Sequence, residues 1–157
     1  MLSEPAFSTW RPWAERHTHE RLKLPGIYAI AVSDTALKGK PFDWTPEIVY
    51  FGMTNSLSGL AGRLKQFDSS INGGPGHGGA QRFLPHYPAG SGTLLHRLYV
   101  SVWPFDCDVR SISPDNRLKM GEVSYAEFQC FAEFSRRFNR LPQFNDKKAS
   151  PKLKTAP

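Results

Sequence analysis

Three side chains that could take part in catalysis lie in or beside predicted buried segments. Tyr28 falls in the apolar run LPGIYAIAVS and Tyr50 in the run EIVYFGM, so two predicted strands each carry a phenol. A phenol hydroxyl can transfer a proton or hold a water molecule. Arg63 lies beside the apolar stripe of a predicted helix, where its guanidinium could bind a phosphate through two parallel hydrogen bonds.

Glu127 is a fourth candidate because of its phase on a later predicted helix. At about 100° per residue, it falls in the middle of the apolar stripe, whereas Glu133 and Glu122 lie on the opposite side. The stripe consists of Val123, Cys130, Phe131, Phe134 and Phe138. A carboxylate inside such a stripe is costly unless it is paired or bound to a cation. The phase therefore predicts either a metal ion beside Glu127 or an ion pair with Arg63.

Coarse patterning places these residues on a small sheet flanked by helices. Alternating apolar residues predict strands, and apolar residues at helical spacing predict helices. The predicted strands cover residues 26–33, 47–53 and 94–103, and the predicted helices cover 54–71 and 115–139. The short connection between the first two strands favours an antiparallel pair. The sequence therefore predicts an α/β domain of the α+β type, with a small, mainly antiparallel three-stranded sheet.

Two tripeptides in the first two predicted strands match a known motif. Residues 26–28 read GIY and residues 50–52 read YFG. A helix with Arg63, a third strand and a glutamate-bearing helix follow in that order. This arrangement resembles the GIY-YIG nuclease family, which includes homing endonucleases, some restriction enzymes and the incision subunit of bacterial excision repair. The resemblance covers residues 25–145, which are expected to form the nuclease-like core.

The resemblance implies a metal-dependent endonuclease that hydrolyses phosphodiester bonds, with DNA as the expected substrate and Mg²⁺ or Mn²⁺ as the cofactor. Tyr28 and Tyr50 would be the candidates for the base that takes a proton from the attacking water. Arg63 would stabilise the charge on the phosphate. The metal ligand would be Glu127, as its helical phase favours, although counting back from LPQFN favours Glu133.

Other site positions of the family are matched less closely. A late asparagine that braces the site would be Asn145, which follows a proline turn, with Asn139 as the alternative. Many members carry a histidine or tyrosine four positions after the arginine, where this chain has Phe67. His77, in the glycine-rich segment NGGPGHGGA, is the candidate to replace it; the segment itself is predicted to be a loop. The connection at residues 34–46 is longer than the one that family members usually have between the two tripeptides, which predicts an insertion between the strands.

The composition indicates which partners and compartment to expect. The 157 residues are predicted to form a single domain, and their net charge of +6 favours a polyanionic partner. No apolar run is long enough for a membrane, and no signal-peptide pattern is visible. With only two cysteines, a reducing cytoplasm is expected. Residues 1–22 are predicted to be a helical extension, and residues 146–157 a basic, disordered tail.

Two further functions remain open at this point. A nuclease-derived module that binds nucleic acid without cutting it is favoured by the phenylalanine at position 67. A basic adaptor that binds protein would need neither a divalent metal nor a salt-dependent affinity for DNA. The sequence does not distinguish a specific, branched or damaged DNA target, and it does not predict the oligomeric state.

Overall fold

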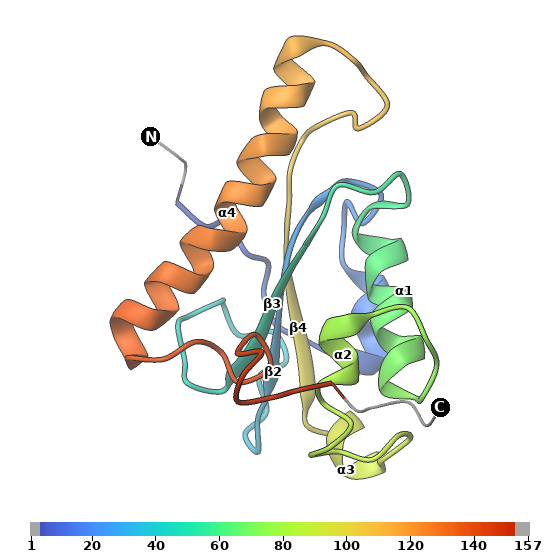
Figure 1. Ribbon diagram of the computed structural model, residues 1–157, viewed down its shortest axis with the longest axis vertical. Coiled ribbons are helices and arrows are strands. Elements are labelled where there is room, and N and C mark those ends of the chain that lie inside the picture. The colour runs from blue at the N-terminus through green and yellow to red at the C-terminus, as the bar shows by residue number, and fades with distance from the viewer. Residues whose placement is uncertain (1–3, 153–157) are drawn as a thin grey trace.

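The chain folds around one four-stranded sheet (Figure 1). The computed structural model describes residues 4–152. In chain order the elements are β1 (Arg11–Pro12), the 3-10 helix η1 (Trp13–Thr18), β2 (Gly26–Val32), β3 (Ile48–Thr54), α1 (Gly59–Ile71), α2 (Gly78–Gln81), α3 (Gly92–Leu95), β4 (Leu98–Pro104) and α4 (Pro114–Phe138). None of the helices in residues 4–152 has the length and apolar character that a membrane crossing needs.

β2 is the central long strand of the sheet, whose order is β1-β4-β2-β3. All three strand pairs are antiparallel. The predicted combination of helices with an antiparallel sheet is confirmed, and all seven residues of β2 are buried. The prediction of three strands is wrong, because Arg11 and Pro12 add a fourth strand by pairing with Val100 and Tyr99. Two residues are too few for an alternating pattern to be visible in the sequence.

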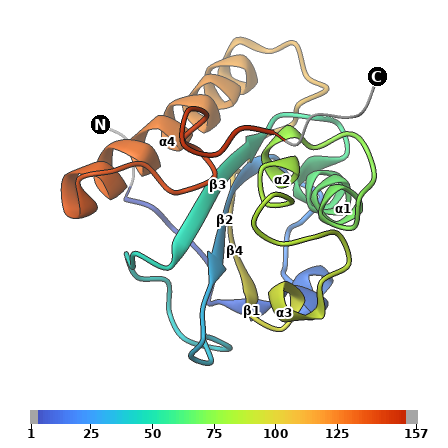
Figure 2. The same cartoon turned by 60° about the horizontal axis from the view of Figure 1, so that its bottom comes forward.

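Side chains of β2 alternate between two cores, one on each face of the sheet. Figure 2 shows α4 on one side of the sheet and α1 and α2 on the other. The α1 side receives Tyr28, Ile30 and Val32, and the α4 side receives Ile27, Ala29 and Ala31. The phenol of Tyr28 therefore points into the layer between the sheet and α1.

Recognisable caps define both ends of α4. Ser113 Oγ accepts a hydrogen bond from the backbone N–H of Asn116 at 3.3 Å, and Pro114 occupies the first turn. Asn139 ends the helix in the left-handed region, with φ at 55°. Because these signals are local, the predicted range of 115–139 agrees closely with the observed helix.

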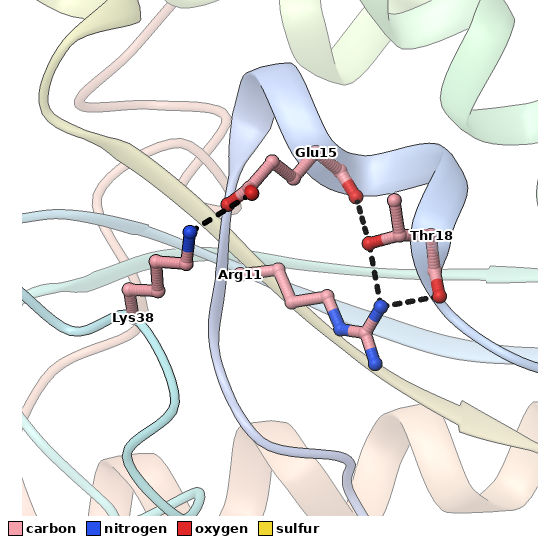
Figure 3. A network of polar contacts seen from close by, with 4 residues as sticks. All are labelled: Arg11, Glu15, Thr18 and Lys38. Carbon is pink, nitrogen blue, oxygen red and sulfur yellow. Dashed lines mark hydrogen bonds and ion pairs between the residues drawn. The ribbon is translucent and has the colours of Figure 1, made fainter.

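The N-terminal segment contains less helix than predicted. Only η1 is helical, because Pro12 holds an extended conformation as part of β1. Figure 3 shows how the short helix is connected: Lys38 Nζ donates to Glu15 Oε1 at 2.9 Å, Thr18 Oγ1 donates to the Glu15 carbonyl, and Arg11 donates to Thr18. These contacts join η1 to the inserted connection between β2 and β3.

Two segments predicted to be irregular have defined structure. The glycine-rich segment, predicted to be a loop, contains the beginning of α2 at Gly78. In the C-terminal segment, predicted to be disordered, the N–H of Ser150 donates to the Asp146 carbonyl at 2.8 Å, and Ser150 is buried. Residues 153–157 of the predicted tail lie outside the described residues.

Candidate active site

Tyr28 lies across the sheet from a glycine that leaves room for its ring. Tyr28 is the partner of Gly52 in the antiparallel pair of β2 and β3. A Cβ on Gly52 would lie 2.3 Å from Tyr28 Oη, and a Cβ on Gly26 would lie 2.2 Å from the backbone oxygen of Trp103 in β4. Both glycines of the two tripeptides are therefore required by close packing, and Gly52 makes space for the fully buried phenol.

His77 is the hydrogen-bond partner of Tyr28. Tyr28 Oη and His77 Nε2 are 2.6 Å apart, and both residues are fully buried. His77 precedes α2, and its Nδ1 accepts a hydrogen bond from the backbone N–H of Ala80 at 3.1 Å. Its ring packs edge-on against Phe67, with centroids 5.0 Å apart. The structure thus places His77 directly beside the position where the resemblance expects a histidine.

These two hydrogen bonds define the tautomer of His77. Burial lowers the pKa of His77 to about 3, and the charge of Arg63 acts in the same direction, so the ring is neutral at pH 7. Because the Ala80 N–H donates to Nδ1, the ring proton must be on Nε2. Nε2 therefore donates to Tyr28 Oη, and the hydroxyl hydrogen of Tyr28 is left for another partner. In this state His77 cannot take a proton from Tyr28.

Tyr50 lies beside Tyr28 and is partly exposed. The two ring centroids are 6.0 Å apart, and a Cβ on Gly79 would lie 2.3 Å from Tyr50 Oη, so a glycine again makes room for a phenol. Burial raises the pKa of both tyrosines; the charge of Glu127 adds to the rise at Tyr50, and Arg63 opposes it at both. Both phenols therefore keep their protons at neutral pH in the free protein.

Arg63 on α1 and Glu127 on α4 bring opposite charges toward the phenols, and both side chains are partly exposed. Burial raises the pKa of Glu127 to about 7, and the charge of Arg63 opposes the rise. Within residues 4–152 no ion pair joins the two, and Arg63 Nη1 instead donates to Gln66 Oε1 at 2.9 Å. The alternative interpretation of Glu127, a buried ion pair with Arg63, is therefore not found in the part of the chain that the structure describes.

Glu133 lies on another side of α4 and is already paired. Its carboxylate accepts hydrogen bonds from Arg136 and Arg137, the latter at 2.6 Å, and the bond from Arg137 lowers the pKa of Glu133. Glu133 also lines a hollow of about 890 Å³ between α4 and residues 42–44. That hollow contains none of the other candidate site residues, so the geometry separates Glu133 from the two phenols.

The two candidate asparagines have different surroundings. Asn145 Oδ1 accepts from the Phe51 N–H at 2.8 Å, and Asn145 Nδ2 donates to the Phe51 carbonyl at 2.9 Å. Phe51 follows Tyr50 in β3, so Asn145 braces the strand that carries the second phenol. Asn139 is the C-terminal cap of α4.

Arg82 and Lys152 are two further cations in this region, and no sequence motif points to them. The charge of Arg82 opposes the rise in the pKa of Tyr50, and the charge of Lys152 contributes to the lowered pKa of His77. A Cβ on Gly78 would lie 2.7 Å from Lys152 Nζ, which places the ammonium next to His77. Arg82 could have been found from its position just after the glycine-rich segment, but nothing in the basic tail distinguishes Lys152 from its neighbours.

The donor set suits a metal ion that needs few protein ligands. Within residues 4–152 no three His, Cys, Asp or Glu side chains gather into a possible metal site. Mg²⁺, however, is commonly held by one or two carboxylates and keeps several of its waters. Glu127 fits this requirement, because a cation beside it would offset the cost of a charge that burial disfavours.

No protein-family model, no curated protein and no solved structure matches this chain. Of the sequence-predicted residues, Tyr28, Tyr50 and His77 form one cluster. Arg63 and Glu127 act on the cluster through their charges.

Proposed function

We propose that the chain is a divalent-metal-dependent endonuclease that hydrolyses phosphodiester bonds, with DNA as its substrate. The observation that carries the proposal is a cluster of two phenols and a neutral histidine, on which the charges of a guanidinium and a carboxylate act. They are Tyr28 of β2, Tyr50 of β3, His77 before α2, Arg63 of α1 and Glu127 of α4. Tyr28 and His77 are fully buried, and burying polar groups costs free energy in a core that needs only to pack. Phosphodiester hydrolysis can use all five groups.

In this proposal the two phenols act on the attacking water. Tyr28 accepts a hydrogen bond from His77, so its own hydroxyl hydrogen is directed elsewhere. Tyr50 is the more exposed of the two and lies beside it. One phenol would orient the water and the other would take its proton. Because burial raises both pKa values, the proton transfer requires further positive charge close to the phenols when substrate is bound.

Arg63 would supply that positive charge directly, and Glu127 would supply it by holding a cation. Arg63 would bind non-bridging oxygens of the phosphate, where negative charge increases in the transition state. Glu127 would hold a divalent cation, which when bound supplies positive charge to the same phosphate. Asn145 would keep β3, and with it Tyr50, in place.

The test is incubation of the purified chain with plasmid DNA, branched DNA and RNA, each with Mg²⁺, with Mn²⁺ and with a chelator. We expect metal-dependent cleavage of DNA, and we expect Tyr28→Phe to slow it by a factor on the order of 10², the usual scale for losing an acid or base. A thermal melt of Tyr28→Phe separates lost chemistry from a lost fold. Wild-type cleavage by a normally folded Tyr28→Phe would return Tyr28 to a packing role.

A nucleic-acid-binding module that does not cut is the second candidate. It is favoured by the raised pKa values of Tyr28 and Tyr50, which leave both phenols protonated in the free protein. This alternative predicts salt-dependent binding of DNA with no cleavage in any of the metal-containing reactions above. The same experiment therefore separates the two functions.

A further inference from the structure

Three cations surround the tyrosine and histidine cluster, and they come from three different segments. Arg63 belongs to α1, Arg82 follows α2 and Lys152 lies in the C-terminal segment. The charges of Arg63 and Arg82 both act on Tyr50, and those of Arg63 and Lys152 both act on His77. Among the groups of residues 4–152 that act on these two residues, Glu127 is the single carboxylate. The cluster therefore lies in a positive field.

The C-terminal segment is held against α2 by specific contacts. Arg82 Nη1 donates to the Ser150 carbonyl at 3.1 Å, and Ser150 is 1% exposed. A compact turn precedes it, in which Asp146 Oδ1 accepts from the backbone N–H groups of Lys148 and Ala149, each at 3.1 Å. Figure 1 shows this red segment crossing from the end of α4 to α2. These contacts fix the position of Ser150, and with it the backbone that leads to Lys152 two residues later.

The glycine-rich segment gives Lys152 access to the cluster. A Cβ on Gly78 would lie 2.7 Å from Lys152 Nζ, and a Cβ on Gly79 would lie 2.3 Å from Tyr50 Oη. The ammonium of Lys152 and the hydroxyl of Tyr50 thus lie over neighbouring glycines, directly after His77. Within residues 4–152, neither Arg82 nor Lys152 forms an ion pair with a carboxylate.

We propose that Arg82 and Lys152 form a second phosphate site, which binds a backbone phosphate of the nucleic acid next to the phosphate held by Arg63. This inference rests on the proposed function. The C-terminal segment is then part of the substrate site: the contact of Arg82 with Ser150 holds it in place, and Lys152 adds a point charge for the phosphate. A second held phosphate would fix the register of the strand relative to the two phenols.

The test compares two lysines that lie four residues apart in the same segment. Binding of a labelled DNA duplex is measured by fluorescence anisotropy at several salt concentrations, with chelator present, for the wild type, Lys152→Gln and Lys148→Gln. Each variant loses one positive charge. Lys152 acts on His77, and Lys148 is not among the groups that do. We expect Lys152→Gln to reduce the slope of log K against log salt by about 0.9. We expect Lys148→Gln to leave that slope unchanged.

Steady-state cleavage supplies a second readout. A site that only holds the strand predicts a raised KM for Lys152→Gln, with kcat little changed. An unchanged salt slope for Lys152→Gln would overturn the proposal. An equal reduction of the slope in both variants would also overturn it, since that would indicate a general effect of the basic segment. A wild type that binds no nucleic acid at any salt concentration would overturn the proposed function itself, and the phosphate site with it. The wild-type measurement therefore tells the two failures apart.

Discussion

His77 makes two hydrogen bonds of opposite direction, one through each ring nitrogen. Nδ1 accepts from the Ala80 N–H and caps α2, and Nε2 donates to Tyr28 Oη. A histidine that only caps a helix and one that orients a phenol would look the same in the sequence. The two roles can be separated by side chains that keep one hydrogen bond each.

We expect His77→Asn and His77→Gln to differ in cleavage rate. Asparagine can accept from the Ala80 N–H, so the cap is kept, but it is too short to reach Tyr28, and the loss of that buried hydrogen bond costs about 1–3 kcal/mol of stability. Its cleavage rate should fall by a factor of about 10 to 100, as expected when one well-placed hydrogen bond is lost. Glutamine can still donate to Tyr28 through its amide, so the rate should be largely kept, while loss of the cap costs about 1 kcal/mol of stability.

Paired measurements of cleavage rate and thermal melting check this expectation. Full activity in His77→Asn would show that His77 acts only as a cap. Nitrogen NMR of the imidazole is an independent check that needs no activity. It should show a protonated Nε2 and an unprotonated Nδ1. The signals of His77 can be assigned because they disappear in His77→Asn.

At the scale of elements, α4 presents two glutamates to different surroundings. Glu127 lies near Arg63 and has no ion-pair partner within residues 4–152, whereas Glu133 is held by Arg136 and Arg137. The helix itself decides this difference, because the two side chains are six residues apart and therefore point in different directions.

We expect Glu127→Gln to abolish metal-dependent cleavage while the fold and DNA binding are kept. The change removes the charge that would hold the cation but hardly alters the volume of the side chain. Glu133→Gln is the matched control on the same helix and should cleave at close to the wild-type rate. Cleavage assays over a range of Mg²⁺ concentrations test both variants. The reverse pattern would show that Glu133 is the metal ligand and that the argument from helical phase is wrong.

The elements that could be predicted are those whose signals are local. α4 was predicted within one residue at each end because Ser113, Pro114 and Asn139 mark its ends. β2 and β3 are visible as short, almost continuous apolar runs. The predicted start of the third strand, at residue 94, was too early, because 92–95 form α3 before β4 begins at Leu98.

How the residues of the candidate site lie relative to one another could not be predicted, because their positions depend on tertiary contacts. Tyr28 and Tyr50 lie on neighbouring strands, so the pairing of those strands brings the phenols together. His77, Arg82 and Lys152 come from irregular segments, and no periodic pattern indicates where they pack. Tertiary contacts place them instead: His77 bonds to Tyr28, Arg82 bonds to Ser150, and Lys152 lies against Gly78.

At the scale of the whole molecule, the partly exposed Glu127 and the buried His77 give stability opposite dependences on pH. The pKa of Glu127 rises from 4.5 to about 7 on folding, so its contribution is present below pH 4.5 and is lost as pH rises through 7. The pKa of His77 falls from 6.5 to about 3, so its contribution is present above pH 6.5 and is lost as pH falls toward 3. Between pH 4.5 and 6.5 the two slopes cancel.

We expect Glu127→Gln to reveal the slope that His77 contributes. Relative to the wild type, its free energy of unfolding should increase between pH 4.5 and 6.5 by at most about 1.4 kcal/mol per pH unit. His77→Asn should show the opposite relative slope over the same range. Urea denaturation in metal-free buffer at a series of pH values measures both. Parallel pH profiles for the wild type and both variants would show that neither group changes its pKa on folding.

The contact between Asn145 and Phe51 also has a consequence for how the molecule behaves at high concentration. β3 is an edge strand, and the exposed N–H and C=O groups of an edge can recruit a strand from another molecule. The side-chain amide of Asn145 occupies both groups of Phe51, much as a neighbouring peptide unit would, and the Phe144 N–H pairs with the Val49 carbonyl. The residues after α4 thus close part of the edge to strand addition, and we expect this cover to oppose edge-to-edge aggregation.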